Sequence, residues 1–195
     1  MRNIEARYNY QIDRNRAAAD NEARRRILAE GALREILNGS INGIKVEKAK
    51  PDEDAGVTFT GQHSQIKGDQ TDLLMSRENN LFLALQVTTG KSNATQEEKT
   101  DLLKTGPFPI VRKQLVPRAV VYLDWNEMSA FLEDHDVSKH TALLDQFYEG
   151  TINSLQYIEM KATDPLKKKL AKEAGDFFYK SREEHKAKKK KPTLH

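Results

Sequence analysis

Apolar positions recur at helical spacing across residues 15–37. Alanine, arginine, leucine and glutamate dominate this segment, and these residue types favour helix. The apolar positions that define the spacing are Ile27, Leu28, Leu33, Ile36 and Leu37. The pair Asn38-Gly39 follows, which is typical of a helix C-terminus. The pattern therefore predicts one helix over 15–37 that stops at this pair.

Short segments rich in β-branched and apolar residues come next, with polar residues alternating in the first of them. The tetrapeptide "RENN" joins the last two and has the composition of a tight turn. The predicted strands are 41–49, 57–61, 72–76 and 81–89.

The second half of the chain predicts a buried strand, "RAVVYLDW" (118–125), surrounded by helices. Asn126 is the expected N-cap of the helix that follows this strand. A proline-punctuated crossing precedes it, and the length of chain between 81–89 and 118–125 fits a right-handed parallel crossover. The predicted helices are 92–104, one starting near 126, 138–160 and 164–185.

This order predicts an α/β fold with a mixed central sheet of four to five strands, flanked by helices, and a helical C-terminal third. We expect an α/β domain over 1–160, followed by a basic helix and lysine-rich tail over 161–195. The chain has 195 residues, a length that suits one compact domain with tails.

Composition narrows the class of protein. Hydrophobic residues make up 37% of the chain and charged residues 31%, so the core should be modest and the surface highly charged. Cysteine is absent, which excludes disulfides and thiolate metal sites. No apolar run approaches the roughly 20 residues that cross a bilayer, and the first residues lack the apolar stretch of a secretory signal. We therefore expect a cytoplasmic protein with no membrane partner.

Net charge is only +3, but basic residues gather in two segments, 13–26 and 161–191. Such clusters track nucleic-acid phosphates through counterion release. Solvated helix faces and a tail would have the same composition, so both interpretations stay open. The candidate nucleic-acid contacts are Arg24, Arg25, Lys188 and Lys189.

Residues suited to a divalent metal lie along "GDQTDLLMSRENNLFLALQVTTGKSN" (68–93). Asp72 opens one predicted strand, and Gln86 and Thr88 share one face of the next because they are two residues apart. Mg²⁺ or Mn²⁺ bound by such oxygens would polarise a phosphate and activate water. Lys91 follows directly and would stabilise the added negative charge.

Further groups could complete this site. The backbone carbonyl of Val87 lies beside Gln86, and Lys99 and Lys104 lie on the following helix. The additional candidate ligands are His63, Asp69 and Glu35. Ordinary structural explanations also stand: Asp72 could cap a turn, and Gln86 could be a satisfied side chain in an apolar strand.

The same segment resembles the core of the PD-(D/E)xK nuclease superfamily, in which an aspartate begins one strand and Glu-x-Lys lies on the next. "QVTT" followed by a helical lysine is also similar to the cap-snatching endonucleases of segmented negative-strand RNA viruses. The resemblance implies that Asp72 is the central metal ligand, that Gln86 takes the glutamate position and that Thr88 takes the lysine position. Lys91, Lys99 or Lys104 would then supply the positive charge.

The resemblance implies a Mg²⁺- or Mn²⁺-dependent endonuclease that hydrolyses phosphodiester bonds of DNA or RNA, with DNA favoured, and a homodimer as in many relatives. The glutamine allows three cases: an active enzyme, a natural non-cleaving relative, or an introduced Glu→Gln substitution. The alternatives to an enzyme are a nuclease fold that binds nucleic acid without cleaving it and a protein-interaction module. The expected catalytic residues are Asp72, Gln86, Thr88, Lys91 and Lys104.

Overall fold

The computed structural model describes residues 21, 24–25, 27–49, 71–89, 101 and 103–189. The N-terminal helix covers residues 27–40, and residues 21, 24 and 25 are helical as well. The predicted strand at 57–61 and most of the predicted helix at 92–104 lie outside the described residues, although 101 and 103–105 are helical.

Four strands form one mixed sheet in the order β1-β2-β3-β6. The β1/β2 and β2/β3 pairs are antiparallel, and β3 pairs with β6 in parallel. The predicted mixed α/β sheet and the parallel pairing across the crossover are therefore confirmed. The strands are β1 (Ile44–Lys48), β2 (Leu73–Arg77), β3 (Asn80–Thr88) and β6 (Arg118–Tyr122).

A tight turn joins β2 to β3, as "RENN" predicts. Glu78 and Asn79 have φ values of 50° and 68°, the left-handed pair that a two-residue hairpin turn requires. The N-terminal helix continues past the predicted stop at Asn38-Gly39 to residue 40. The left-handed residue of the following turn is instead Gly43, with φ 75°.

Three helices follow the sheet: α3 (Trp125–Asp134), α4 (Thr141–Lys161) and α5 (Pro165–Lys189). The strand predicted over 118–125 ends earlier, at Tyr122, and Trp125 already belongs to α3. The prediction of Asn126 as N-cap was wrong, because the Asp124 side chain accepts from the backbone N–H groups of Asn126 and Glu127. A side-chain acceptor one residue before the helix satisfies these donors directly.

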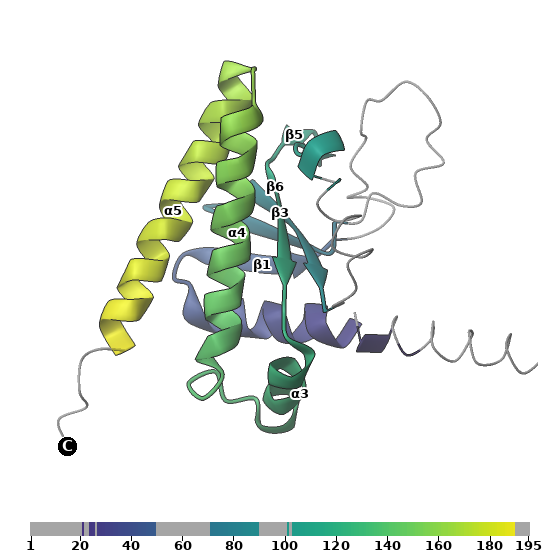
Figure 1. The fold of residues 1–195 in the computed structure, drawn as a ribbon, viewed down its shortest axis with the longest axis vertical. Helices are drawn as coiled ribbons and strands as arrows, with labels where there is room; N and C mark the ends of the chain where they lie inside the picture. The colour runs from purple at the N-terminus through teal and green to yellow at the C-terminus, as the bar shows by residue number, and fades with distance from the viewer. Residues whose placement is uncertain are drawn as a thin grey trace, which may run out of the picture.

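All of these helices pack on one face of the sheet, which we call the helix face. Figure 1 shows α4 and α5 side by side against it, with the purple N-terminal helix running across their lower end. Alternate strand residues, among them Leu73, Leu85 and Val121, join buried helical residues in one hydrophobic cluster. Phe178 of α5 is fully buried in this cluster and stacks on Phe82 of β3. Helix α5 therefore shares the core of the preceding segments, across the predicted boundary near residue 160.

A small hairpin, β4 (Ile110–Val111) and β5 (Gln114–Leu115), covers part of the opposite face, which we call the hairpin face. Its Val111 packs with Leu74 and Ala84, side chains that point away from the helices. Arg112 anchors the hairpin to Glu47 of β1 through a 2.5 Å contact and holds the pKa of that carboxyl below its usual value.

Side chains form hydrogen bonds with backbone groups on both outer edges of the sheet. Asn38 donates to the Val46 carbonyl at 3.1 Å and accepts from the Val46 N–H at 2.9 Å. On the other edge, the Ser154 hydroxyl accepts from the Val120 N–H at 3.0 Å. Capped edges offer fewer free groups to a strand from another chain. No helix in the described part of the chain is long and apolar enough to cross a membrane.

Candidate functional site

Asp72 immediately precedes β2 and is buried, with 3% of its surface exposed. Its backbone continues the sheet in both directions: its N–H donates to the Leu85 carbonyl at 2.9 Å, and its carbonyl accepts from Ala49 at 3.0 Å. This double pairing places the Asp72 side chain beside the second half of β3. The strands thus bring together the two positions that the sequence pattern singled out.

One oxygen of Asp72 accepts two hydrogen bonds from β3. Gln86 Nε2 and the Val87 backbone N–H each donate to Asp72 Oδ2 at 2.7 Å. Hydrogen bonds to an ionised group are stronger than those between neutral groups, and they stabilise a charge that would otherwise be costly to bury. The Asp72–Gln86 contact is therefore a specific, buried polar pair.

The amide of Gln86 has a second atom with a different environment. The residue is completely buried, and Oε1 accepts no hydrogen bond from the residues that the structure describes. Thr71 Oγ1, one residue before Asp72, is likewise buried without a partner there. Buried polar atoms without partners are rare in folded proteins, and each calls for an explanation such as a bound ion or water.

The side chains of this pair lie on the hairpin face. Gln86 is two residues after Ala84, which packs with the hairpin, and Asp72 has the same parity as Leu74. Thr88 follows on the same side and is also buried. Strand alternation directs the Val87 carbonyl toward β2, like that of Leu85, so this oxygen lies on the Asp72 side of β3.

Glu35 does not join this site. Its residue neighbours on the N-terminal helix, Leu33 and Ile36, pack into the helix-face cluster, on the side of the sheet opposite Gln86. The Glu35 carboxylate is half exposed and contacts His135 Nδ1 at 3.0 Å. The sequence could not show that the sheet separates this helix from the candidate metal ligands.

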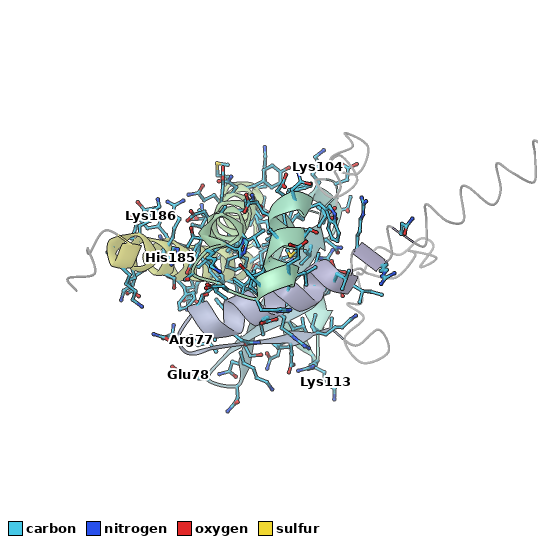
Figure 2. All side chains as sticks on the ribbon, turned by 90° about the horizontal axis from the view of Figure 1, so that it is seen from below. Arg77, Glu78, Lys104, Lys113, His185 and Lys186 are labelled. Atoms are coloured by element: carbon cyan, nitrogen blue, oxygen red, sulfur yellow. The ribbon has the colours of Figure 1, made fainter. Side chains whose placement is uncertain are left out.

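Lys104 is also placed elsewhere in this structure. Its ammonium pairs with Asp101 at 2.8 Å, and it lines a hollow with Tyr157 and Lys161 that does not include Asp72 or Gln86. Figure 2 shows Lys104 on the opposite side of the ribbon from Lys113 of the β4–β5 turn.

The basic residues proposed to contact nucleic acid do not form one surface. Arg24 and Arg25 lie near the start of the N-terminal helix, and the Arg25 guanidinium is 5.1 Å from the centre of the Trp125 ring. Lys188 instead lines a hollow with Ser40, at the far end of that helix. The two places are about 22 Å apart along the helix, at about 1.5 Å per residue.

Other predicted site residues fall outside the described residues: His63, Asp69, Lys91 and Lys99. Lys189 closes α5, and nothing is described of its side chain. Within the described ranges, no three histidine, cysteine, aspartate or glutamate side chains are grouped as metal ligands.

One residue near the pair was missed by the sequence interpretation. Arg118 opens β6, is 1% exposed, and pairs in register with Ala84, two residues before Gln86. Its side chain therefore lies on the hairpin face with the polar pair. The signal was present in "RAVVYLDW", where a charged residue begins an otherwise apolar strand. Buried arginines in proteins are usually paired with anions.

Comparison with protein-family models, with curated proteins and with solved structures finds no match for this chain.

Proposed function

We propose that this protein is a divalent-metal-dependent endonuclease that hydrolyses phosphodiester bonds of nucleic acids. The observation that carries the proposal is the buried Asp72–Gln86 pair, with the Gln86 amide oxygen left without a hydrogen-bond donor in the described residues. The order helix, β1, β2, β3, helical segment and β6, with the small β4–β5 hairpin before β6, supports it, because the PD-(D/E)xK core also runs from a helix through strands and a helix to a further strand.

The residues of this pair fit a hard cation such as Mg²⁺ or Mn²⁺. Asp72 would supply a carboxylate, Gln86 would supply its amide oxygen, and Val87 would supply a backbone carbonyl, all of which are oxygen ligands that these cations prefer. When bound, the metal would polarise the phosphate and lower the pKa of a coordinated water. Asp69 or His63 would complete the ligand set.

The chain's own residues have separate tasks in this proposal. Asp72 carries the negative charge that holds the cation, and the Val87 N–H fixes the orientation of its carboxylate. Lys91 supplies positive charge to the phosphate, since Thr88 occupies the position of the usual lysine. Preorganised charge of this kind stabilises the transition state because it needs no rearrangement during the reaction.

A nuclease fold that binds nucleic acid without cleaving it is the second candidate. The hydrogen bond from Gln86 to Asp72 favours it, because it holds the amide against the carboxylate without a cation between them. Two carboxylates at the same positions would repel each other and would need a cation between them. Binding would then be salt-sensitive and independent of metal.

The deciding experiment is calorimetric titration of Mn²⁺ into the wild-type protein, Asp72→Asn and Glu78→Gln, followed by cleavage assays on DNA and RNA. Asp72→Asn keeps an acceptor for Val87 but removes the charge. Glu78→Gln removes the same charge from the exposed β2–β3 turn. We expect Asp72→Asn alone to lose metal binding and cleavage.

Cleavage that is unchanged in Asp72→Asn would contradict the enzyme. Tight nucleic-acid binding in EDTA, with neither metal binding nor cleavage in the wild-type protein, would establish the second candidate instead.

A further inference from the structure

A second concave surface lies where α4 ends and α5 begins, and we call it the lysine hollow. Its volume is about 570 Å³, within the range of about 300–1,000 Å³ that is typical of small-ligand sites. In Figure 1 this junction lies at the top of the molecule, at the same end as β5. The side chains that define the lysine hollow are Lys104, Phe108, Tyr157, Lys161, Thr163 and Lys167.

Two of these lysines have no acidic partner within the part of the chain that the structure describes. Lys161 and Lys167 make no ion pair with the residues that the structure describes, whereas other lysines of α5 do pair along the helix. Those pairs are Lys169–Glu173 at 3.7 Å and Lys172–Asp176 at 3.2 Å. The lysine hollow therefore gathers positive charge that no ion pair within the described residues neutralises.

Asp164 also lines the lysine hollow and directs one carboxylate oxygen at the start of α5. Asp164 Oδ1 accepts from the backbone N–H of Leu166 at 2.8 Å and of Lys167 at 3.3 Å. These bonds cap the start of α5, so the free ammonium groups, and not the helix end, are available to an anion. The first turn of α5 contains no acidic residue, and a lysine there is unfavourable beside the positive end of the helix dipole. An external anion beside Lys167 would add to the compensation that the Asp164 carboxylate already gives.

Aromatic rings lie beside the positive charge. The Lys167 ammonium is 5.8 Å from the centre of the Phe108 ring, and Phe108 and Tyr157 are both partly exposed. Lysines that track phosphates, next to aromatic faces on which bases stack, are the combination that binds single-stranded nucleic acid. A base within a duplex is already stacked and could not enter a concave surface.

The lysine hollow also adjoins the face that carries the candidate metal site. Leu115 of the β4–β5 hairpin lines the hollow, while Val111 of the same hairpin and Val116, the residue after β5, pack on the hairpin face against Ala84. A strand bound in the hollow would therefore lie beside the hairpin.

We infer that the lysine hollow binds a single strand of nucleic acid, with phosphates at Lys161 and Lys167 and a base against Phe108. The inference rests on the proposed function and deepens it, because it names single-stranded nucleic acid as the substrate class.

The test is fluorescence anisotropy of a labelled oligothymidylate with the full chain in EDTA, over a series of salt concentrations. The variants are Lys161→Ala/Lys167→Ala and Phe108→Leu. The control is Lys169→Ala/Lys172→Ala, which removes the same amount of positive charge but takes it from outside the hollow, on α5. Circular dichroism checks that each variant is folded. We expect the first double variant to weaken binding about tenfold or more and to reduce the salt slope by about 1.4, the value for two phosphates on a single strand. The control should stay within about twofold of wild type because its lysines face acids of the same helix.

Equal weakening by both double variants would overturn the inference, because it would mean attraction by net charge alone. Equal binding of a duplex, or competition by polyglutamate as strong as that by unlabelled oligothymidylate, would also overturn it. Phe108→Leu should weaken the single strand and leave duplex binding unchanged. Asp72→Asn should bind normally in EDTA. Loss of cleavage in Asp72→Asn with normal binding in Lys161→Ala/Lys167→Ala would reject the hollow and keep the nuclease. Unchanged cleavage in Asp72→Asn with weakened binding in Lys161→Ala/Lys167→Ala would reject the nuclease and keep the hollow.

Discussion

Gln86 donates a 2.7 Å hydrogen bond from Nε2 to Oδ2 of Asp72, and both side chains are buried. The contact joins the residue before β2 to the second half of β3, the strand that follows β2 after the turn at Glu78 and Asn79. The amide thus occupies the place where a second carboxylate would require a cation.

Replacement of this amide by a carboxylate tests that relationship. In Gln86→Glu the donor to Asp72 is lost and two buried carboxylates face each other, so we expect a loss of about 1–3 kcal/mol of stability in EDTA. Added Mn²⁺ should restore the stability, because a cation compensates the repulsion. Thermal unfolding over a range of Mn²⁺ concentrations measures both effects.

Gln114→Glu is the matched control, since Gln114 makes an exposed contact to the Leu81 N–H. Its unfolding should change little and should not depend on Mn²⁺. An unfolding temperature of Gln86→Glu that is insensitive to Mn²⁺ would contradict a shared cation site.

Helix α4 approaches β6 closely at Gly150. A Cβ at this position would lie 3.0 Å from the Val120 carbonyl oxygen and 3.2 Å from the Val121 Cα. These are backbone atoms that cannot rotate away, so Gly150→Ala should cost about 1–3 kcal/mol by forcing the helix off the strand. Urea denaturation measures the loss.

Gly175 of α5 provides the contrast, because a Cβ there would meet only the Leu155 Cβ at 3.7 Å. Gly175→Ala should therefore gain about 0.5–1 kcal/mol from helix propensity. A stabilising Gly150→Ala would show that α4 and β6 are not in this close contact.

Local sequence signals predicted four strands of the sheet and the parallel crossover well, because the buried segments of β3 and β6 are apolar; the predicted strand at 57–61 lies outside the described residues. They missed the β4–β5 hairpin, whose strands have two residues each, too few for alternation to appear. The cap of α3 was misplaced because Asp124 and Asn126 are equally suitable residue types. Only the end of β6 at Tyr122 decides between them.

The candidate site was predictable only in part for a similar reason. Asp72, Gln86 and Thr88 lie on adjacent strands, so their proximity follows from one hairpin. Glu35 and Lys104 depend on how helices pack, and periodicity does not show which face of the sheet a helix covers. Arg118 was visible as a charged residue in an apolar strand, but its alignment with Ala84 required the register of β3 and β6.

Tyr148 should make the protein sensitive to alkali. Burial, followed by the charges of Glu184 and Asp145, raises its pKa from 10.0 to about 12. Because the folded state holds this proton more tightly than the unfolded state, the associated stability is complete below pH 10 and is lost as pH rises toward 12. The loss should reach about 2–3 kcal/mol, at about 1.4 kcal/mol per pKa unit.

Urea denaturation of the wild-type protein and Tyr148→Phe between pH 9 and pH 12 measures this slope. The phenylalanine variant should show a smaller decline. Tyr179→Phe is the control, since Tyr179 is 53% exposed, and it should decline as the wild type does. Identical slopes for all three proteins would show that Tyr148 ionises in the folded state without cost.

Asn38 should contribute more to the stability of the fold than an ordinary surface amide, because it both donates to and accepts from the backbone of Val46. Asn38→Ala leaves both groups of the β1 edge without this partner, and we expect a loss of about 1–3 kcal/mol. Asn38→Asp keeps the acceptor for the Val46 N–H but sets a carboxylate against the Val46 carbonyl. Its stability relative to wild type should therefore rise as the pH falls, when the protonated carboxyl regains a donor.

Urea denaturation at several pH values distinguishes the two variants, and Asn42→Asp in the adjacent exposed turn controls for the added charge. A pH-independent difference between Asn38→Asp and wild type would mean that the amide donor contributes nothing to holding the edge of the sheet.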